Sequence, residues 1–169
     1  MKNITSPFIT RTRLLAVLTV TCFALGFTGV QAGDDKSAVG ANSNGERSIL
    51  ISWNLDFTSD TTADGTSTIA GAFSDEGARH EDFTVNVQGN RATVTGTIVI
   101  HGSQGDITEQ FVGTIPLGPN PTLIEGTGVF TGGTGAYAGV TGRGTFEGTI
   151  DFATGKLVGV TEGRVRIGH

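Results

Sequence analysis

The sequence predicts an all-β protein, an eight-stranded antiparallel closed barrel, with a two-sheet β-sandwich as the alternative. Three observations predict this fold. Short segments alternate between apolar and polar residues, which is the period of a half-buried strand. Turn signals separate these segments at regular intervals. Glycines also fall inside the expected strands, where they permit the bends that a small barrel needs. These glycines are Gly96, Gly113, Gly126, Gly144 and Gly148.

Residues 1–32 have the pattern of a secretory signal peptide. Three basic residues precede an apolar run over 14–27, and Val30-Gln31-Ala32 offers small residues for cleavage after Ala32. We therefore expect a secreted or periplasmic protein with no membrane span after processing. An uncleaved anchor is one alternative. A lipoprotein attached through Cys22 is another, although the Thr before this Cys fits such a cleavage site poorly.

The expected remainder is a flexible leader over 33–47 and a β-barrel domain over 48–169. Removing the signal takes away three of the 11 basic residues and no acidic residue, which leaves eight basic and 16 acidic residues and a net charge of −8. Such a surface is a poor match for nucleic acid, whose phosphates attract clustered Lys and Arg. The sole Cys leaves with the signal, so the domain is expected to be stabilised without disulfides.

The first half of the domain contains four expected strands, over 49–58, 66–74, 79–88 and 91–101. Asp64-Gly65 predicts the first turn and Gly89-Asn90 the turn between the third and fourth strands. The first strand points inward with Ile49, Ile51, Trp53, Leu55 and Phe57. The third strand places Phe83, Val85 and Val87 on one face. The fourth points inward with Ala92, Val94, Gly96, Ile98 and Ile100.

The second half contains the other four expected strands, over 107–115, 123–130, 142–152 and 156–167. Prolines exclude regular pairing over 116–121, so this segment is expected to be a loop. The fifth strand places Ile107, Glu109, Phe111, Gly113 and Ile115 on one face. The seventh points inward with Phe146, Ile150 and Phe152.

A glycine-rich segment over 133–139 lies between the sixth and seventh strands. It is not a phosphate-binding loop, because no Lys and no helix follow it. We expect a wide connection with Tyr137 folded over one barrel end. The longer stretch from Phe130 to Gly144, F-T-G-G-T-G-A-Y-A-G-V-T-G-R-G, resembles the signature of the allene oxide cyclase-like and dirigent-like barrels. Exported bacterial proteins carry similar segments.

The resemblance implies an eight-stranded, lipocalin-like barrel, often found as a homo-oligomer. Plant members of this family guide the cyclisation or radical coupling of apolar small molecules inside the barrel. Their catalytic residues lie outside the shared loop, so none is carried over to this chain. One fold hosts many functions, and the resemblance therefore supports the fold more than an activity.

Glu109 is the candidate catalytic residue. A carboxylate on an apolar face has its charged form disfavoured and can act as a general acid or base. The alternative is that a strand end or a bulge turns Glu109 into water. Trp53, Phe111 and Tyr137 are the candidate ligand-binding residues, because aromatic rings form flat walls for an apolar ligand. The alternative for them is a purely structural place in the core.

No metal site or cofactor is expected. The three histidines, His80, His101 and His169, have no metal-binding spacing. The acidic cluster of Asp75, Glu76, Glu81 and Asp82 is expected to be a solvated turn. Three functions stay open: an exported barrel that binds an apolar small molecule, a cofactor-free cyclase, isomerase or coupling guide, and a structural or interaction module of the envelope or extracellular matrix.

Overall fold

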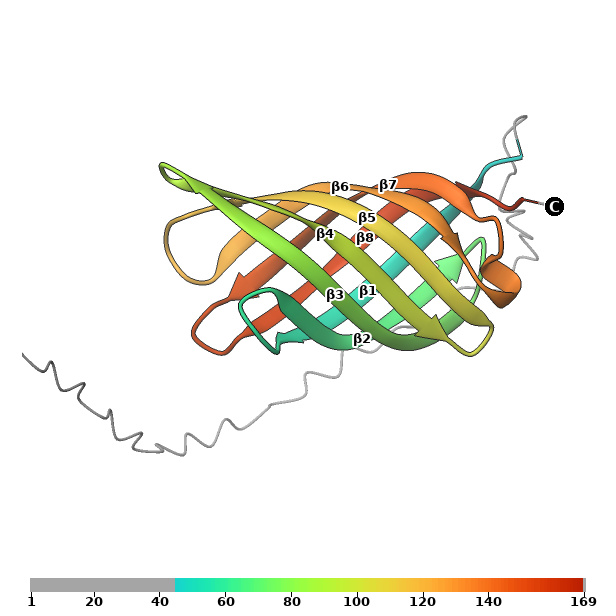
Figure 1. Cartoon of the computed structure of the whole chain (residues 1–169), viewed down its shortest axis with the longest axis horizontal. Helices are drawn as coiled ribbons and strands as arrows, with labels where there is room; N and C mark the ends of the chain where they lie inside the picture. Colours follow the sequence, from blue (N-terminus) through green and yellow to red (C-terminus); the bar gives the residue numbers. More distant parts are fainter. Residues whose placement is uncertain (1–44, 169) are drawn as a thin grey trace, which may run out of the picture. The chain divides into compact units, whose positions relative to one another are not determined.

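A computed structural model describes residues 45–168, and these residues form one closed eight-stranded antiparallel barrel (Figure 1). The predicted all-β barrel is thus confirmed. Each strand pairs with its neighbours along the chain, and β8 returns to pair with β1. The strands are β1 (Arg47–Phe57), β2 (Thr62–Gly71), β3 (Asp75–Gln88), β4 (Arg91–Gly102), β5 (Gly105–Pro116), β6 (Thr122–Gly133), β7 (Thr141–Asp151) and β8 (Lys156–Arg166).

The alternation of apolar and polar residues places one face of every strand in the barrel interior. In β4, for example, Ala92, Val94, Ile98 and Ile100 are buried while Thr93 and Thr95 face outward. The predicted inward face of β5, Glu109 included, is also buried. Burial of these apolar side chains is the main stabilising term for the domain. Within residues 45–168, closure gives every strand two paired neighbours.

The turn predicted at Asp64-Gly65 is wrong. Both residues lie inside β2, where Asp64 pairs with Asp56 and Gly65 pairs with Leu55. The chain turns earlier, over residues 58–61. A Cβ atom added at Gly65 would collide with the backbone carbonyl of Asn54. The glycine is therefore needed for close approach of two strands, not for a turn.

Two further expectations need correction. The acidic cluster predicted as a solvated turn belongs to β3, which begins at Asp75 rather than at residue 79, and Glu81 points into the barrel. Phe152 was expected inside, but β7 ends one residue earlier and Phe152 is 54% exposed. Val85 and Val87 share the predicted face with Phe83, yet they are exposed because the β3–β4 hairpin projects beyond the barrel end (Figure 1).

One end of the barrel is closed by the segment between β6 and β7, which contains a single turn of 3₁₀ helix, η1 (Gly135–Tyr137). The Tyr137 side chain is fully buried, and its ring packs edge-on against Phe73 with centroids 4.7 Å apart. Its hydroxyl donates a hydrogen bond of 2.8 Å to the carboxylate of Asp75. Tyr137 thus covers this end of the barrel as a plug, held by Phe73 and by the hydrogen bond to Asp75.

Asp75 anchors the closed end through several hydrogen bonds. Its carboxylate also accepts bonds from the backbone N–H groups of Glu76, Ser103 and Gln104 and from the Ser103 hydroxyl. The bonds from Ser103 and Tyr137 hold the pKa of Asp75 well below its usual range. The carboxylate therefore ties the β2–β3 and β4–β5 connections to η1.

Several predictions concern residues outside the described part of the chain. They are the signal peptide over 1–32 with cleavage after Ala32, Cys22, most of the leader over 33–47, and His169. Within residues 45–168, no helix has the length and apolar character to cross a membrane.

Candidate functional site

The open end of the barrel contains a cavity of about 360 Å³. It lies where the β1–β2, β3–β4, β5–β6 and β7–β8 connections meet, opposite the Tyr137 plug. The strands supply its walls because their inward positions near this end carry aliphatic and aromatic side chains. The lining residues are Phe57, Ser59, Asp60, Glu81, Phe83, Val85, Val87, Ala92, Val94, Phe111, Ile115, Leu117, Ile124, Ile150, Phe152 and Leu157. Its size is within the ~300–1,000 Å³ of small-molecule sites.

Aromatic rings form one side of the cavity mouth. Phe57 stacks in parallel on Phe152, with ring centroids 6.3 Å apart, and meets Phe83 edge-on at 6.0 Å. Phe111, deeper in the wall, packs edge-on against Phe146 at 5.9 Å. Both arrangements are favourable for aromatic pairs. The exposed Phe152 and the β3–β4 hairpin give the mouth an apolar surface that a ligand can cover.

Glu81 is the polar group at the inner part of the cavity. Among the lining residues on β3 it lies farthest from the β3–β4 turn. Its Oε1 accepts a hydrogen bond of 2.7 Å from Nε of Arg79 and lies 2.6 Å from Nη2 of the same guanidinium. The two side chains are only 3% and 7% exposed. Such a pair is costly to desolvate, so its place inside the barrel needs a reason beyond stability.

Arg79 lies over the ring of Trp53, with its guanidinium carbon 5.2 Å from the ring centroid. The indole packs against the backbone of Gly148 and Gly159, and a Cβ atom at either glycine would collide with the ring. The indole N–H donates a hydrogen bond of 3.3 Å to the Thr161 hydroxyl. Glycine, indole and guanidinium thus form successive layers, and the cation–π contact favours the buried charge of Arg79.

Glu109 is a second carboxyl group inside the barrel. It lies in the same cross-strand row as Glu81, with Ile98 between them. Neither of its oxygens has a hydrogen-bond partner within residues 45–168. Burial raises the pKa of Glu109 to about 7, an effect that Arg79 reduces and Glu81 increases. A Cβ atom at Gly128 would overlap the Glu109 carboxylate, so the glycine makes room for it.

The predicted site residues occupy different parts of the barrel. Phe111 lines the cavity. Trp53 and Glu109 are buried deeper in the barrel and are not lining residues, and Tyr137 plugs the opposite end. Their predicted roles in catalysis or ligand binding stay predictions.

Sequence reasoning missed Arg79 and Glu81. A signal was present, because both residues have the same parity as Phe83, which was predicted to share its face with other apolar residues. Two charged residues at positions of an inward face indicate an internal pair.

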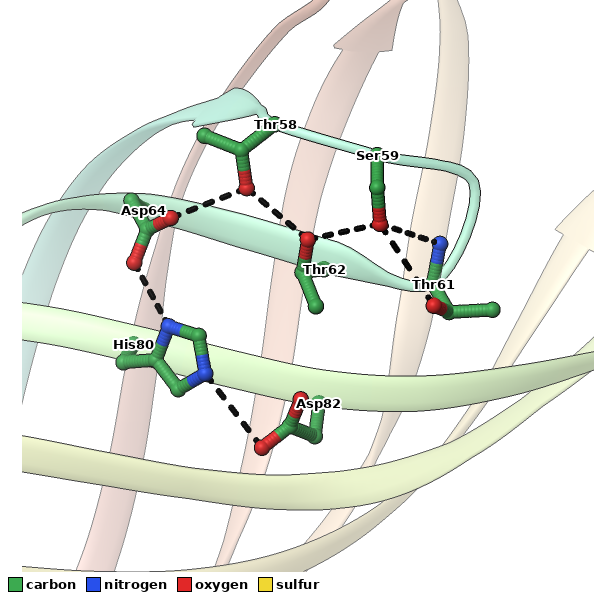
Figure 2. Close-up of polar contacts among 7 residues, drawn as sticks. All are labelled: Thr58, Ser59, Thr61, Thr62, Asp64, His80 and Asp82. Atoms are coloured by element: carbon green, nitrogen blue, oxygen red, sulfur yellow. Dashed lines mark hydrogen bonds and ion pairs between the residues drawn. The ribbon is translucent and has the colours of Figure 1, made fainter.

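A polar network holds the turn that forms part of the cavity rim. Figure 2 shows the hydroxyl groups of Thr58, Ser59 and Thr62 linked to one another, at 2.9 Å for Thr58–Thr62 and 2.7 Å for Ser59–Thr62. Thr58 also donates a hydrogen bond of 2.9 Å to Asp64. The backbone N–H of Thr61 donates to the Ser59 hydroxyl at 3.1 Å. Hydrogen bonds from serine and threonine side chains thus stabilise this turn, which has no Asn-Gly or Asp-Gly pair.

His80 continues this network along the outer surface of β3. Its Nδ1 lies 2.6 Å from Asp64, and its Nε2 lies 3.3 Å from Asp82 (Figure 2). The hydrogen bond to Asp64 is the main cause that raises the pKa of His80, and it lowers the pKa of Asp64 in turn. The imidazole therefore bridges two carboxylates when it is protonated.

A larger hollow of about 1640 Å³ lies along the outside of the barrel. Backbone of the glycine-rich strands β7 and β8 forms much of its surface, and Arg143, Arg164 and Glu162 stand beside one another on it. Its charged lining residues have both signs and are Glu46, Arg143, Glu162, Arg164 and Arg166. Within residues 45–168, no cluster of three or more His, Cys, Asp or Glu residues is arranged to hold a metal ion.

The fold and the cavity define a small closed antiparallel β-barrel with an apolar opening at one end and an internal ion pair beneath it, an architecture compatible with a ligand-binding barrel. Comparisons with protein-family models, with curated proteins and with solved structures found no match.

Proposed function

We propose that this protein binds an apolar small molecule in the cavity at the open end of its barrel. The observation that carries the proposal is the apolar cavity itself, bounded by side chains of Phe83, Phe111 and Ile115. Eight strands form a barrel whose interior either is filled by side chains or holds one small ligand. Here one end is plugged by Tyr137, while the other end has room for a ligand.

The exposed apolar side chains at the mouth support this proposal. Val85, Val87, Leu117 and Phe152 are all exposed and all line the cavity. A ligand seated among them would remove apolar surface from water, which is the main driving force for such binding. The proposal includes export, which is supported by the basic, apolar and small-residue pattern of residues 1–32.

The proposal of a cofactor-free cyclase or coupling guide has less support. It depends on Glu109, whose raised pKa suits an acid or base, but Glu109 is not a lining residue of the cavity. The cavity favours ligand binding over a structural module, whose barrel interior is expected to be filled by side chains. The resemblance to allene oxide cyclase-like barrels stays a prediction that is compatible with either binding or catalysis.

A fluorescent hydrocarbon tests the proposal. Diphenylhexatriene, which gains fluorescence in apolar surroundings, is titrated against the protein and against Ala92→Trp, which fills the cavity from β4. Thr93→Trp is the matched control, because Thr93 is the next residue of the same strand and faces outward. We expect the protein and Thr93→Trp to bind the dye and Ala92→Trp to lose binding.

A rim variant covers the case in which Ala92→Trp unfolds through overpacking. Val85 is 48% exposed and lines the cavity, so Val85→Trp obstructs the mouth without changing the buried core. Absence of dye binding by the native protein, or equal binding by the native protein and every folded variant, overturns the proposal.

A further inference from the structure

We propose that the ligand carries a hydrogen-bond donor at its inner end, an amine or an alcohol, and that a carboxylic acid is rejected. This inference rests on the proposed binding function. It concerns the polar end of the ligand, which the apolar walls do not specify. It is carried by the arrangement of Glu81 and Arg79 at the inner part of the cavity.

The two oxygens of Glu81 have different surroundings. Oε1 receives both contacts from Arg79, through Nε and Nη2. Oε2 takes part in none of the hydrogen bonds formed within residues 45–168, and it is not among the fully buried atoms that lack a partner, so it keeps some accessible surface. An ionised carboxylate only accepts hydrogen bonds. A ligand group that forms a hydrogen bond with Oε2 of Glu81 must therefore be an N–H or an O–H donor.

The position of the positive charge excludes an anionic partner. Glu81 is a lining residue, whereas Arg79 is not. An entering carboxylate would therefore meet the like charge of Glu81 before the guanidinium. Nε and Nη2 of Arg79 already contact Glu81. Its Nη1 has no hydrogen-bond partner within residues 45–168, but this atom is fully buried and Arg79 does not line the cavity. The other ionisable group lining the cavity, Asp60, is acidic as well. Glu109, beyond Ile98, adds a further negative charge when it ionises. Each of these carboxylates favours a neutral or cationic donor over an anion.

A ligand without a donor would also bind less well. Its apolar body would displace water from Glu81 and leave Oε2 buried without a partner. Sites built around a buried polar group reject ligands that cannot bond to it, because the group then loses its hydrogen bonds to water without replacement. Donor chemistry at the ligand's inner end is thus the property that this site selects.

Four compounds that share a ten-carbon chain provide the test, each measured by displacement of diphenylhexatriene at pH 8. They are 1-decanol and decylamine, which offer a donor, decanoic acid, which is an anion, and methyl decanoate, which only accepts hydrogen bonds. We expect the alcohol and the amine to bind at least about tenfold more tightly than the acid and the ester. Equal affinity for the acid and the alcohol, or tighter binding of the acid, overturns the inference.

Variants assign the selectivity to Glu81. Glu81→Gln offers both a donor and an acceptor, so the preference for the alcohol over the acid should fall to within about threefold. Glu125→Gln, on the outer surface, is the matched control and should keep the native preference. If Glu81→Gln unfolds because Arg79 loses its partner, the double variant Arg79→Met, Glu81→Leu removes both charges together, a change that is often tolerated. Native selectivity in either folded variant overturns the role of Glu81.

The outcomes separate this inference from the function on which it rests. If the hydrocarbon dye fails to bind, the proposed function fails. If the dye binds and all four compounds displace it equally, the cavity binds apolar molecules and the inference about the donor fails.

Discussion

The guanidinium of Arg79 lies over the ring of Trp53, 5.2 Å from its centroid, inside a barrel whose other inward side chains are mostly apolar. Trp53 is the single tryptophan of the chain, so tryptophan fluorescence reports only on the surroundings of this ring. The indole is fixed from behind by two glycines and from the side by Thr161. Changes in the interior are therefore measurable through one residue.

Gly159→Ala should destabilise the domain by about 1–3 kcal/mol, because the added methyl group collides with the backbone carbonyl of Glu147 and with the Trp53 ring. The displaced ring should become more accessible to water, which shifts the fluorescence maximum to longer wavelength. Urea denaturation and the emission spectrum measure both effects. Gly118→Ala is the control, since a methyl group there meets nothing within 4 Å. A native spectrum for Gly159→Ala would contradict this packing.

The stability of the protein should fall as the pH rises from about 4.5 to about 7 because of Glu109. Its pKa is raised from 4.5 in the unfolded chain to about 7 in the barrel, so the folded state holds the proton more tightly in this range. The free energy of unfolding should fall by roughly 3 kcal/mol in total, and the decrease is complete above pH 7. Urea midpoints between pH 4 and pH 8 measure it.

Glu109→Gln should remove most of this pH dependence, because an amide does not ionise. Glu125→Gln, which changes an exposed carboxyl group, should keep the native slope. Identical slopes for Glu109→Gln and the native protein would show that Glu109 is not the group that titrates.

Tyr137→Phe should destabilise the closed end of the barrel at neutral pH, since the variant lacks the hydroxyl that donates to Asp75. The pKa of Asp75 is depressed in the folded state, so its contribution is present above about pH 3.8 and is lost as the pH falls through the folded-state value. The variant and the native protein should therefore differ at pH 7 and converge in strong acid. Urea denaturation at several pH values tests this expectation, and a constant difference would contradict it.

His80 should titrate above its ordinary pKa of 6.5, chiefly because of its hydrogen bond to Asp64. The pKa of Asp64 is lowered below 3.8, so the ion pair is complete between about pH 4 and pH 6.5. Its stabilising effect is lost as the pH rises through the folded-state pKa of His80 and as it falls through that of Asp64. A proton NMR titration of the His80 ring measures this pKa. Asp64→Asn should bring it back toward 6.5, while an unchanged value would assign the shift to another group.

Much of the barrel was predictable because its strands obey one simple rule. In β4 and β5, most inward positions carry apolar residues and most outward positions carry polar ones, so the inward positions of Ile98 and Phe111 follow from the sequence. The Asp64-Gly65 turn was wrong because Gly serves two purposes. It permits turns, and it permits close approach between strands, and only the register of β1 against β2 distinguishes them here.

The charged residues inside the barrel, Arg79, Glu81 and Glu109, were predictable only in part. Glu109 follows from alternation in β5, whereas Arg79 and Glu81 interrupt an otherwise apolar inward face on β3. Alternation tells which face a residue occupies but does not tell what it meets across the barrel. The contact of Arg79 with Trp53 joins β3 to β1 across β2, so it depends on the register of three strands, which alternation does not give.

Closure through β1 and β8 also constrains the order in which the protein can fold. Arg47 pairs with Val165, and the hydrogen bond from Trp53 to Thr161 joins residues 108 positions apart. During synthesis, β1 therefore cannot complete its pairing until β8 has been made. Until then, the edge of β1 that pairs with β8 is open to other chains. Within residues 45–168, the other seven strand pairings join consecutive strands, so β1–β8 is the distant one. All-β domains fold on the scale of about milliseconds to seconds. Aggregation of the nascent chain competes with folding throughout that delay.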